Sequence, residues 1–355
     1  MEKDLQSKHL GYRPKNLSCS QCASLIDISS FKPLDHFFCP QCNQETVVPA
    51  KLGIYEICGF LGRGAMGRVY LANDPLLHRE VAIKILRENL STSPKMWALL
   101  EQEGKIAAGI THANVIQIYT MGKILGRPYI VMELANYASL YDLMAQGLIS
   151  EALATQIAID VIKGLRAAYQ LHLIHGDIKP ANILITSKQH AKITDFGLAR
   201  YLDYDQEVER WGTPYYIAPE KSEQLREDFR SDLYSLGATL FHAMAGYAPY
   251  EGKTGEEVIS KSLKSSIPKL HKANASISKE MSELIFKLMR KNPDDRFWSF
   301  DQALACFEDL QENCYKLGSC KRLKSGDNVH SDQQKSWIHG LRNLIVDDDV
   351  PDEKI

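Results

Sequence analysis

The chain has 355 residues, of which 45% are hydrophobic and 24% are charged, as is ordinary for a soluble globular protein. This length allows about two or three domains. The 42 Lys and Arg residues nearly balance the 44 Asp and Glu residues, and the formal net charge of −2 disfavours a protein that binds nucleic acid through overall positive charge. With 22 Gly and 14 Pro, the composition also excludes collagen-like and largely disordered chains.

Two features of the sequence concern the cellular location. No apolar run approaches the ~18 residues of a membrane-spanning helix, and the polar residues 1–15 lack the apolar stretch of a secretory signal. We therefore expect a cytoplasmic protein without a membrane partner. In that reducing compartment the 8 cysteines are not expected to form disulfides.

Four of the cysteines form two close pairs near the N-terminus: Cys19 with Cys22, and Cys39 with Cys42, in the pattern C-x2-C-x16-C-x2-C. This spacing is typical of a zinc site, in which each pair turns the chain so that two thiolates point at one metal ion. Residues 1–50 are too few to fold on a hydrophobic core alone, so a structural Zn²⁺ would supply most of the stability of this segment.

Residues 1–50 thus resemble a zinc ribbon. The alternative is two redox-active pairs or four unrelated thiols, although no βαβ pattern surrounds either pair as a thioredoxin-like fold requires. We do not expect nucleic acid as a partner of the ribbon, whereas a protein partner there stays open. The reason is that its basic residues are scattered and not interleaved with aromatic residues: Lys3, Lys8, Arg13, Lys15 and Lys32.

A glycine-rich segment follows after a short connector. Alternating apolar residues flank Gly62, Gly64 and Gly67, which predicts a strand, a tight turn and a second strand. A dinucleotide-binding loop would be followed by a helix instead. The pattern therefore favours a loop that lies over nucleotide phosphates. The next apolar strand, 81–84, ends in Lys84, which is either a solvated charge or a phosphate ligand.

Further elements and motifs come in a fixed order. We predict a helix over 95–111, which contains Glu101 and Glu103, and an amphipathic helix over 151–172. The short motifs that follow are His175-Gly176-Asp177, Asn182, Asp195-Phe196-Gly197, Ala218-Pro219-Glu220, Asp232 and Arg296.

Taken together, these motifs resemble those of the bacterial Hanks-type Ser/Thr protein kinases, and the resemblance covers residues 54–310. It implies an α+β, bilobal protein-kinase fold, with a small β-rich N-lobe over 54–135 and a large α-helical C-lobe over 136–310. The zinc-ribbon segment, 1–50, would precede this domain, and a polar tail, 311–355, would follow it.

The resemblance also implies catalytic roles. Asp177 would orient the substrate hydroxyl and accept its proton, and Lys179 would reach the γ-phosphoryl group of ATP. Lys84, paired with Glu103 or with its less well spaced competitor Glu101, would hold the α- and β-phosphates. The Mg²⁺ ligands would be Asn182 and Asp195. The residues expected to contact the nucleotide are Gly62, Arg63, Gly64, Ala65, Met66, Gly67, Val69, Ala82, Lys84, Met132, Glu133, Ala135 and Leu184.

Two further expectations are structural. Glu220 and Arg296 would form a buried ion pair, and Asp232 would hold the backbone of the catalytic loop. The chain departs from the family at Gly176, which stands where an arginine usually receives an activation-loop phosphate. Residues 195–211 contain no Ser or Thr, and their only hydroxyl groups belong to Tyr201 and Tyr204. We therefore hypothesise that activity does not depend on Ser/Thr phosphorylation of this loop.

The sequence thus predicts a cytoplasmic, ATP- and Mg²⁺-dependent Ser/Thr protein kinase that acts on protein substrates. Two alternatives remain. One is a pseudokinase scaffold, which Gly176 supports best. The other is a binding protein that acts through the zinc ribbon.

Overall fold

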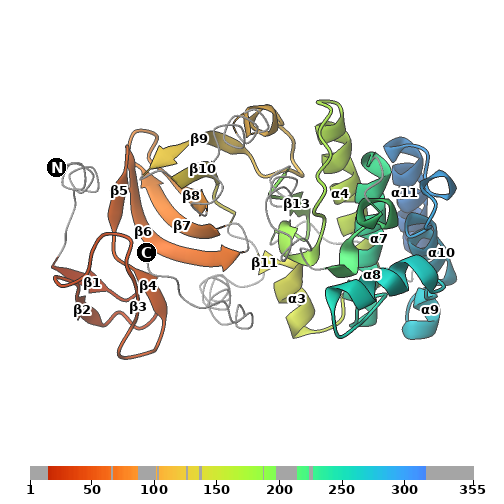
Figure 1. Ribbon diagram of the computed structural model, residues 1–355, viewed down its shortest axis with the longest axis horizontal. Coiled ribbons are helices and arrows are strands. Elements are labelled where there is room, and N and C mark those ends of the chain that lie inside the picture. Colours follow the sequence, from red (N-terminus) through yellow and green to blue (C-terminus); the bar gives the residue numbers. More distant parts are fainter. Residues whose placement is uncertain are drawn as a thin grey trace. The chain divides into compact units, whose positions relative to one another are not determined.

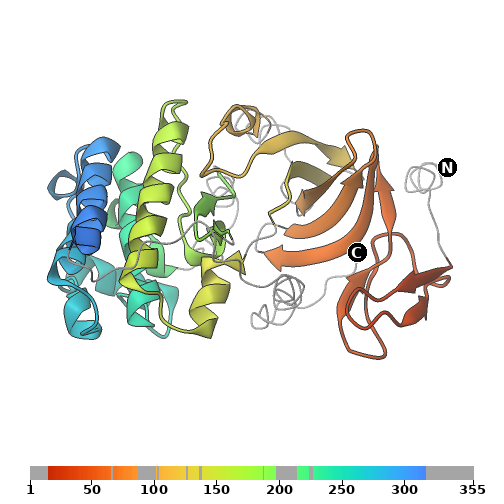
Figure 2. The ribbon, with the colours of Figure 1, turned by 180° about the vertical axis from the view of Figure 1, so that it is seen from behind.

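The computed structural model describes residues 15–64, 67–86, 101, 104–124, 127–135, 138–186, 188–196, 214–223 and 227–316. It divides into two compact units (Figures 1 and 2). Unit 1 comprises Met1–Thr92, Tyr119–Leu134 and His330–Ile355, and unit 2 comprises Ser93–Ile118 and Ala135–Val329. In the part of the chain that the structure describes, no helix combines the length and apolar character needed to cross a membrane.

Unit 1 begins with two short antiparallel hairpins. The first pairs β1 (Asn16–Ser18) with β2 (Leu25–Asp27), and the second pairs β3 (His36–Phe38) with β4 (Glu45–Val47). A cysteine pair occupies the turn of each hairpin. These turns share one backbone pattern: the first cysteine donates its N–H to the carbonyl five residues later, at 2.8 Å in both turns. A small core joins the hairpins, formed by Cys19, Ile26, Ile28, Phe37, Cys39 and Val48.

The rest of unit 1 is a six-stranded sheet in the order β5-β6-β7-β8-β10-β9. Its strands are β5 (Ala50–Leu52), β6 (Tyr55–Gly64), β7 (Gly67–Asp74), β8 (Arg79–Leu86), β9 (Ile118–Ile124) and β10 (Arg127–Glu133). The strand–turn–strand prediction around the glycines is confirmed, because β6 and β7 form an antiparallel hairpin that closes on the pair Gly64 and Gly67.

The connector between the cysteine motif and the glycine-rich segment is itself a strand. β5 pairs with β6 through Ala50 opposite Ile57 and Leu52 opposite Tyr55. Just before it, Val47 on β4 is fully buried and belongs to the apolar core of the six-stranded sheet. Both views show β4 beside β6 (Figures 1 and 2). The chain therefore passes from the hairpins into the sheet without a flexible link.

Unit 2 is mainly helical. Its α-helices are α3 (Leu140–Gln146), α4 (Glu151–Tyr169), α6 (Pro219–Ser222), α7 (Phe229–Ala245), α8 (Gly255–Lys264), α9 (Leu270–Ala273), α10 (Lys279–Leu288) and α11 (Phe300–Lys316). Short 3₁₀ turns lie at η3 (Pro180–Asn182), η4 (Pro214–Tyr216) and η5 (Pro293–Asp295). Helix α7 packs against α4 and α10, and most of its side chains are buried.

The amphipathic helix predicted over 151–172 is confirmed as α4, which begins after the N-cap Ser150 and ends at Tyr169, before the left-handed residue His172 (φ 59°). Its apolar positions are buried in the core of unit 2. Of the helix predicted over 95–111, residues 101 and 104–108 are helical, whereas 95–100, 102 and 103 lie outside the described residues. Helix α11 continues to Lys316, into the segment expected to be a tail, and residues 317–355 are not described.

A small sheet of unit 2 positions the catalytic motifs. Strand β12 (Ile183–Ile185) pairs with β11 (Ala138–Ser139) and, in a hairpin, with β13 (Ala191–Ile193). Ile183 lies opposite Ile193, and the N–H of Thr194 donates to the carbonyl of Asn182 at 3.1 Å. The hairpin register therefore brings Asn182 next to the segment that carries Asp195.

Candidate active site and cysteine cluster

The loop between α4 and β12 gathers three of the predicted catalytic side chains. The amide Nδ2 of Asn182 donates to the carboxylate Oδ2 of Asp177 at 2.9 Å and to the Asp177 carbonyl at 2.8 Å. Lys179 Nζ lies 2.9 Å from the same Oδ2 atom. The Asp177 carboxylate is thus held by an amide and an ammonium group, with about a fifth of its side chain exposed to solvent. This geometry can orient a hydroxyl group and accept its proton.

Asp232, on α7, anchors the backbone of this loop. Its carboxylate accepts the N–H groups of His175 and Gly176, both at 2.8 Å. Asp232 is only 2% exposed, and this burial raises the pKa of its carboxyl group above the ordinary value. The expected anchoring role is confirmed. Sequence reasoning missed a second support, Lys221, whose Nζ donates to the carbonyl of Gly176 at 2.9 Å.

Asp195 follows β13 and adopts a left-handed conformation (φ 65°). Such backbone is uncommon for non-glycine residues and often marks functional segments. His175 holds this segment in place: its Nε2 lies 2.8 Å from the Thr194 carbonyl, and its ring lies 4.6 Å from that of Phe196. The backbone of Asn182 lies beside that of Thr194, the residue before Asp195. The side chains of Asn182 and Asp195 therefore start from neighbouring points of the backbone, which suits two oxygen ligands of one cation.

Four predicted nucleotide-binding residues of unit 1 lie on strands that are neighbours in the sheet. Val69 on β7 pairs with Lys84 on β8, and Ala82 on β8 pairs with Met132 on β10. All four are buried or half-buried, with Lys84 only 5% exposed. Position 67 has room only for glycine, because a Cβ there would lie 2.1 Å from the carbonyl oxygen of Ile85.

The remaining predicted residues are placed as follows. Gly62 and Arg63 pair with Val69 and Arg68 across the β6–β7 hairpin. Glu133 ends β10 in unit 1, whereas Ala135 and Leu184 belong to unit 2, and all three are half-buried. Glu103, Ala65 and Met66 lie outside the described residues. The competitor Glu101 lies 2.8 Å from Lys105 Nζ, one helical turn away.

The buried ion pair between Glu220 and Arg296 is confirmed. Arg296 Nη1 and Nη2 each donate to one oxygen of Glu220 at 2.7 Å. Burial alone would raise the pKa of Glu220, but the hydrogen bonds and charge of Arg296 outweigh it and hold this pKa below its ordinary value. Ser231 Oγ donates a further hydrogen bond to Glu220 Oε1 at 2.7 Å. The pair ties the segment after η4 to the end of η5.

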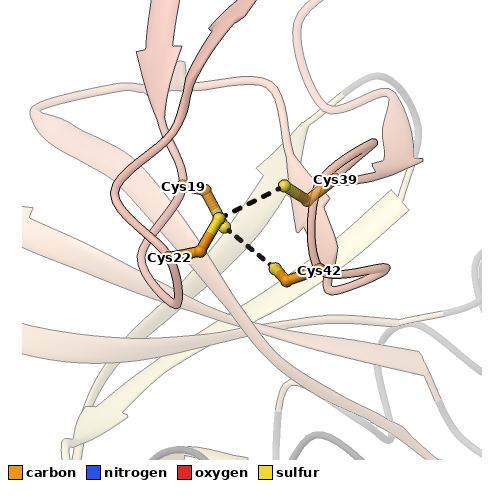
Figure 3. A group of neighbouring side chains, drawn as sticks. All are labelled: Cys19, Cys22, Cys39 and Cys42. Atoms are coloured by element: carbon orange, nitrogen blue, oxygen red, sulfur yellow. Dashed lines mark hydrogen bonds between the residues drawn. The ribbon is translucent and has the colours of Figure 1, made fainter.

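The four N-terminal cysteines converge on one point (Figure 3). Their Sγ atoms all lie within 4.8 Å of one another. The contacts Cys19–Cys42 and Cys22–Cys39 measure 3.7 Å, far longer than the ~2.05 Å of a disulfide. Four sulfurs placed ~2.3 Å from a tetrahedral Zn²⁺ would be about 3.8 Å apart. The donor set and its spacing therefore fit a zinc ion.

The thiols of this cluster also receive hydrogen bonds. Ser24 Oγ lies 3.3 Å from Cys39 Sγ, and this contact lowers the pKa of Cys39 below that of an ordinary thiol. The N–H of Gln21 donates to Cys19 Sγ at 3.4 Å. Hydrogen bonds of this kind stabilise thiolates, the form in which cysteine binds metal. Both buried cysteines, Cys19 and Cys39, lie at the start of their turns.

Comparison with known proteins agrees with this geometry. The protein kinase domain family matches residues 55–306. The serine/threonine-protein kinase PknB of Mycolicibacterium smegmatis is 33% identical over 253 residues, which are 68% of this chain and 40% of PknB. A probable serine/threonine-protein kinase of Clostridium perfringens is 30% identical over 277 residues, which are 77% of this chain and 40% of that protein.

Solved structures agree as well. The crystal structure of the Mycobacterium tuberculosis PknI kinase domain is similar with a TM-score of 0.59 and 25% identity, and the match covers 73% of this chain and 96% of that one. This chain spans about two fifths of the length of the curated relatives named above. The catalytic motifs occur in the order found in protein kinases, within the matched region and on the same fold. This chain therefore belongs to the protein kinase family.

Proposed function

We propose that this chain is a Ser/Thr protein kinase that transfers the γ-phosphoryl group of ATP to hydroxyl groups of protein substrates. One observation carries the proposal. Asp177, Lys179 and Asn182 form a hydrogen-bonded group on a backbone that Asp232 anchors. In the kinase reaction, the substrate oxygen forms a bond to the γ-phosphorus while the bond to the β-phosphate oxygen breaks. ADP leaves, and Asp177 takes the hydroxyl proton.

The other residues would position the reactants. Lys179 would contact the γ-phosphoryl group, and Lys84, with Glu103, the α- and β-phosphates. Asn182 and Asp195 would hold Mg²⁺, which neutralises phosphate charge when bound. The glycine-rich loop, 62–67, would bring its backbone N–H groups to the phosphates. Adenine would lie against Val69, Ala82 and Leu184, with Met132 at the back and the backbone of Glu133 and Ala135 at its edge.

A phosphotransfer assay tests the proposal. Purified chain is incubated with labelled ATP, Mg²⁺ and a basic protein substrate, beside Asp177→Asn and Lys84→Met variants. We expect transfer by the wild type and a loss of about 10²–10⁴-fold in Asp177→Asn, the usual contribution of a general base. ATP binding without transfer in the wild type would refute the proposal and would favour a scaffold. Phosphorylation of Tyr alone would refute the Ser/Thr assignment.

The proposal includes independence from Ser/Thr phosphorylation of the activation loop, although residues 197–213 lie outside the described part of the chain. The residue that supports this part of the proposal is Gly176, which has φ 74° and whose carbonyl accepts a hydrogen bond from Lys221. Glycine offers no cation to a phosphate at this position. Active enzyme would be treated with phosphatase and its phosphopeptides mapped. Activity should persist, and its loss on removal of a phosphate from residues 195–211 would overturn this part.

We further propose that the four cysteines hold a structural Zn²⁺, supported by sulfur separations of 3.7 Å in two pairs. Reduced thiols accord with a cytoplasmic location. In this proposal residues 1–50 form the ribbon, 54–310 the kinase domain and 311–355 the tail. Metal analysis of the purified chain should find one zinc per chain, and Cys39→Ser should abolish it. Full zinc content in Cys39→Ser would refute this assignment.

A further inference from the structure

The β3–β4 hairpin, whose turn carries Cys39 and Cys42, is in direct contact with the glycine-rich hairpin β6–β7. Glu45 on β4 accepts a hydrogen bond from Arg63 Nη2 at 2.6 Å. Arg63 stands between Gly62 and Gly64, so the contact reaches the loop itself. The two residues are 18 positions apart and belong to the same compact unit.

A second residue of the hairpin completes the contact. His36 Nδ1 lies 3.0 Å from Glu45 Oε1, and since a carboxylate only accepts, Nδ1 donates. The other ring nitrogen, Nε2, lies 3.0 Å from the hydroxyl of Tyr70 on β7. The His36 ring also packs edge-on against Phe60 on β6, with centroids 4.6 Å apart. His36 therefore touches both strands of the glycine-rich hairpin.

The contact is partly buried on the ribbon side. The side chains of His36 and Glu45 are 11% and 17% exposed, whereas that of Arg63 is 46% exposed. Burial alone would raise the pKa of Glu45, but hydrogen bonds from His36 and Arg63 outweigh it and lower this pKa. Val47, two residues after Glu45 on β4, is fully buried in the core of the six-stranded sheet. The hairpin thus presents a hydrogen-bonded carboxylate to a loop residue whose side chain is about half exposed to solvent.

We propose that Glu45, oriented by His36, is a positioning residue for nucleotide binding, because it restrains Arg63 and with it the glycine-rich loop. This inference rests on the proposed function. A loop held in its binding conformation before the nucleotide arrives loses less conformational entropy on binding. Removing the restraint should therefore weaken nucleotide binding while the catalytic group around Asp177 stays intact. The steady-state signature is a higher KM for ATP with little change in kcat.

The test is a double-mutant cycle on the full-length chain, with Glu45→Gln, Arg63→Gln and the double variant. ADP affinity is measured by titration calorimetry, and KM and kcat are measured for ATP. We expect Glu45→Gln to weaken ADP binding about two- to fivefold, as suits an ion pair with one partly exposed partner. The same Glu45→Gln change should have no further effect when Arg63 is already Gln, since contacting residues are coupled.

Glu56→Gln is the matched control. Glu56 lies on the same strand as Arg63, at the end far from the loop, and forms an ion pair with Lys51 at 3.1 Å that is more exposed than the Glu45–Arg63 pair. It should leave ADP affinity unchanged. Thermal unfolding of all variants separates a fold defect from a positioning effect, and equal loss of affinity in Glu45→Gln and Glu56→Gln would overturn the inference.

Two outcomes distinguish this inference from the proposed function. A wild-type chain that binds ADP but transfers no phosphate refutes the kinase activity, while the cycle in ADP affinity still decides the role of Glu45. An active wild type with additive effects of Glu45→Gln and Arg63→Gln refutes the positioning role alone. Wild-type chain that binds no nucleotide overturns both.

Discussion

The Glu220–Arg296 pair allows the most quantitative prediction. Arg296 is 3% exposed, and its guanidinium donates five hydrogen bonds. Two go to the Glu220 carboxylate and three to backbone carbonyls, so every donor direction is used. Among the described residues, Glu220 is the only side chain that accepts hydrogen bonds from Arg296, and its charge compensates that of the buried guanidinium.

Glu220→Gln keeps the shape of the side chain but removes its charge. An amide N–H would then face a guanidinium N–H, and Arg296 would remain buried without the carboxylate that accepts two of its hydrogen bonds. Removing one partner of a buried ion pair typically costs about 3–5 kcal/mol. This is a large share of the ~5–15 kcal/mol that stabilises an ordinary domain. We therefore expect a much lower urea midpoint for the helical unit.

The assay is urea unfolding followed by far-ultraviolet circular dichroism, which reports mainly on helices. Asp294→Asn is the control, because Asp294 forms an exposed pair with Arg230 and should cost at most about 1 kcal/mol. The double variant Glu220→Gln/Arg296→Met should be less destabilised than the sum of its single variants. A cost for Glu220→Gln no larger than for Asp294→Asn, or strict additivity in the double variant, would refute this reasoning.

The same pair predicts a pH dependence. The pKa of Glu220 is lower in the folded chain than its ordinary value, so its ionised form stabilises the fold above that ordinary value. This contribution is lost as the pH falls through the lowered folded pKa. The difference in stability between wild type and Glu220→Gln should therefore be full near neutral pH and shrink in acid below about pH 4. A constant difference over this range would contradict the assigned cause.

Three further predictions concern the catalytic loop and the cysteine cluster. Gly176→Ala should cost about 1–2 kcal/mol in urea unfolding, because φ 74° strains any residue with a Cβ; no measurable cost would contradict the observed backbone. Asp232→Asn should cost about 1.5–3 kcal/mol, since it weakens two backbone hydrogen bonds to a carboxylate, and should lower kcat more than it raises the KM for ATP. Zinc removal by a chelator should weaken ADP binding of the wild type as much as Glu45→Gln does, and should weaken that variant no further. A chelator that leaves wild-type ADP affinity intact would contradict the link between cluster and loop.

Features that depend on local spacing could be read from the sequence. Two CxxC turns aim their sulfurs inward because each turn is short, and the structure brings all four sulfurs together. The 3.6-residue period of apolar positions in 151–172 predicted α4, since such a face must be buried. Likewise, glycines between alternating apolar residues predicted the β6–β7 hairpin. The buried pair of Glu220 and Arg296, far apart in the chain, followed from the family resemblance.

Features that depend on packing between distant segments came only from the tertiary structure. Three residues of the connector extend the sheet as β5 because Val47 and Leu52 are drawn into its core, which no local pattern specifies. The support of Gly176 by Lys221 joins residues 45 positions apart. Contact between Glu45 and Arg63 depends on how the cysteine-bearing β3–β4 hairpin packs against the six-stranded sheet. Local spacing therefore determined the chemistry that this chain carries, whereas burial of apolar surface between segments decided what holds that chemistry in place.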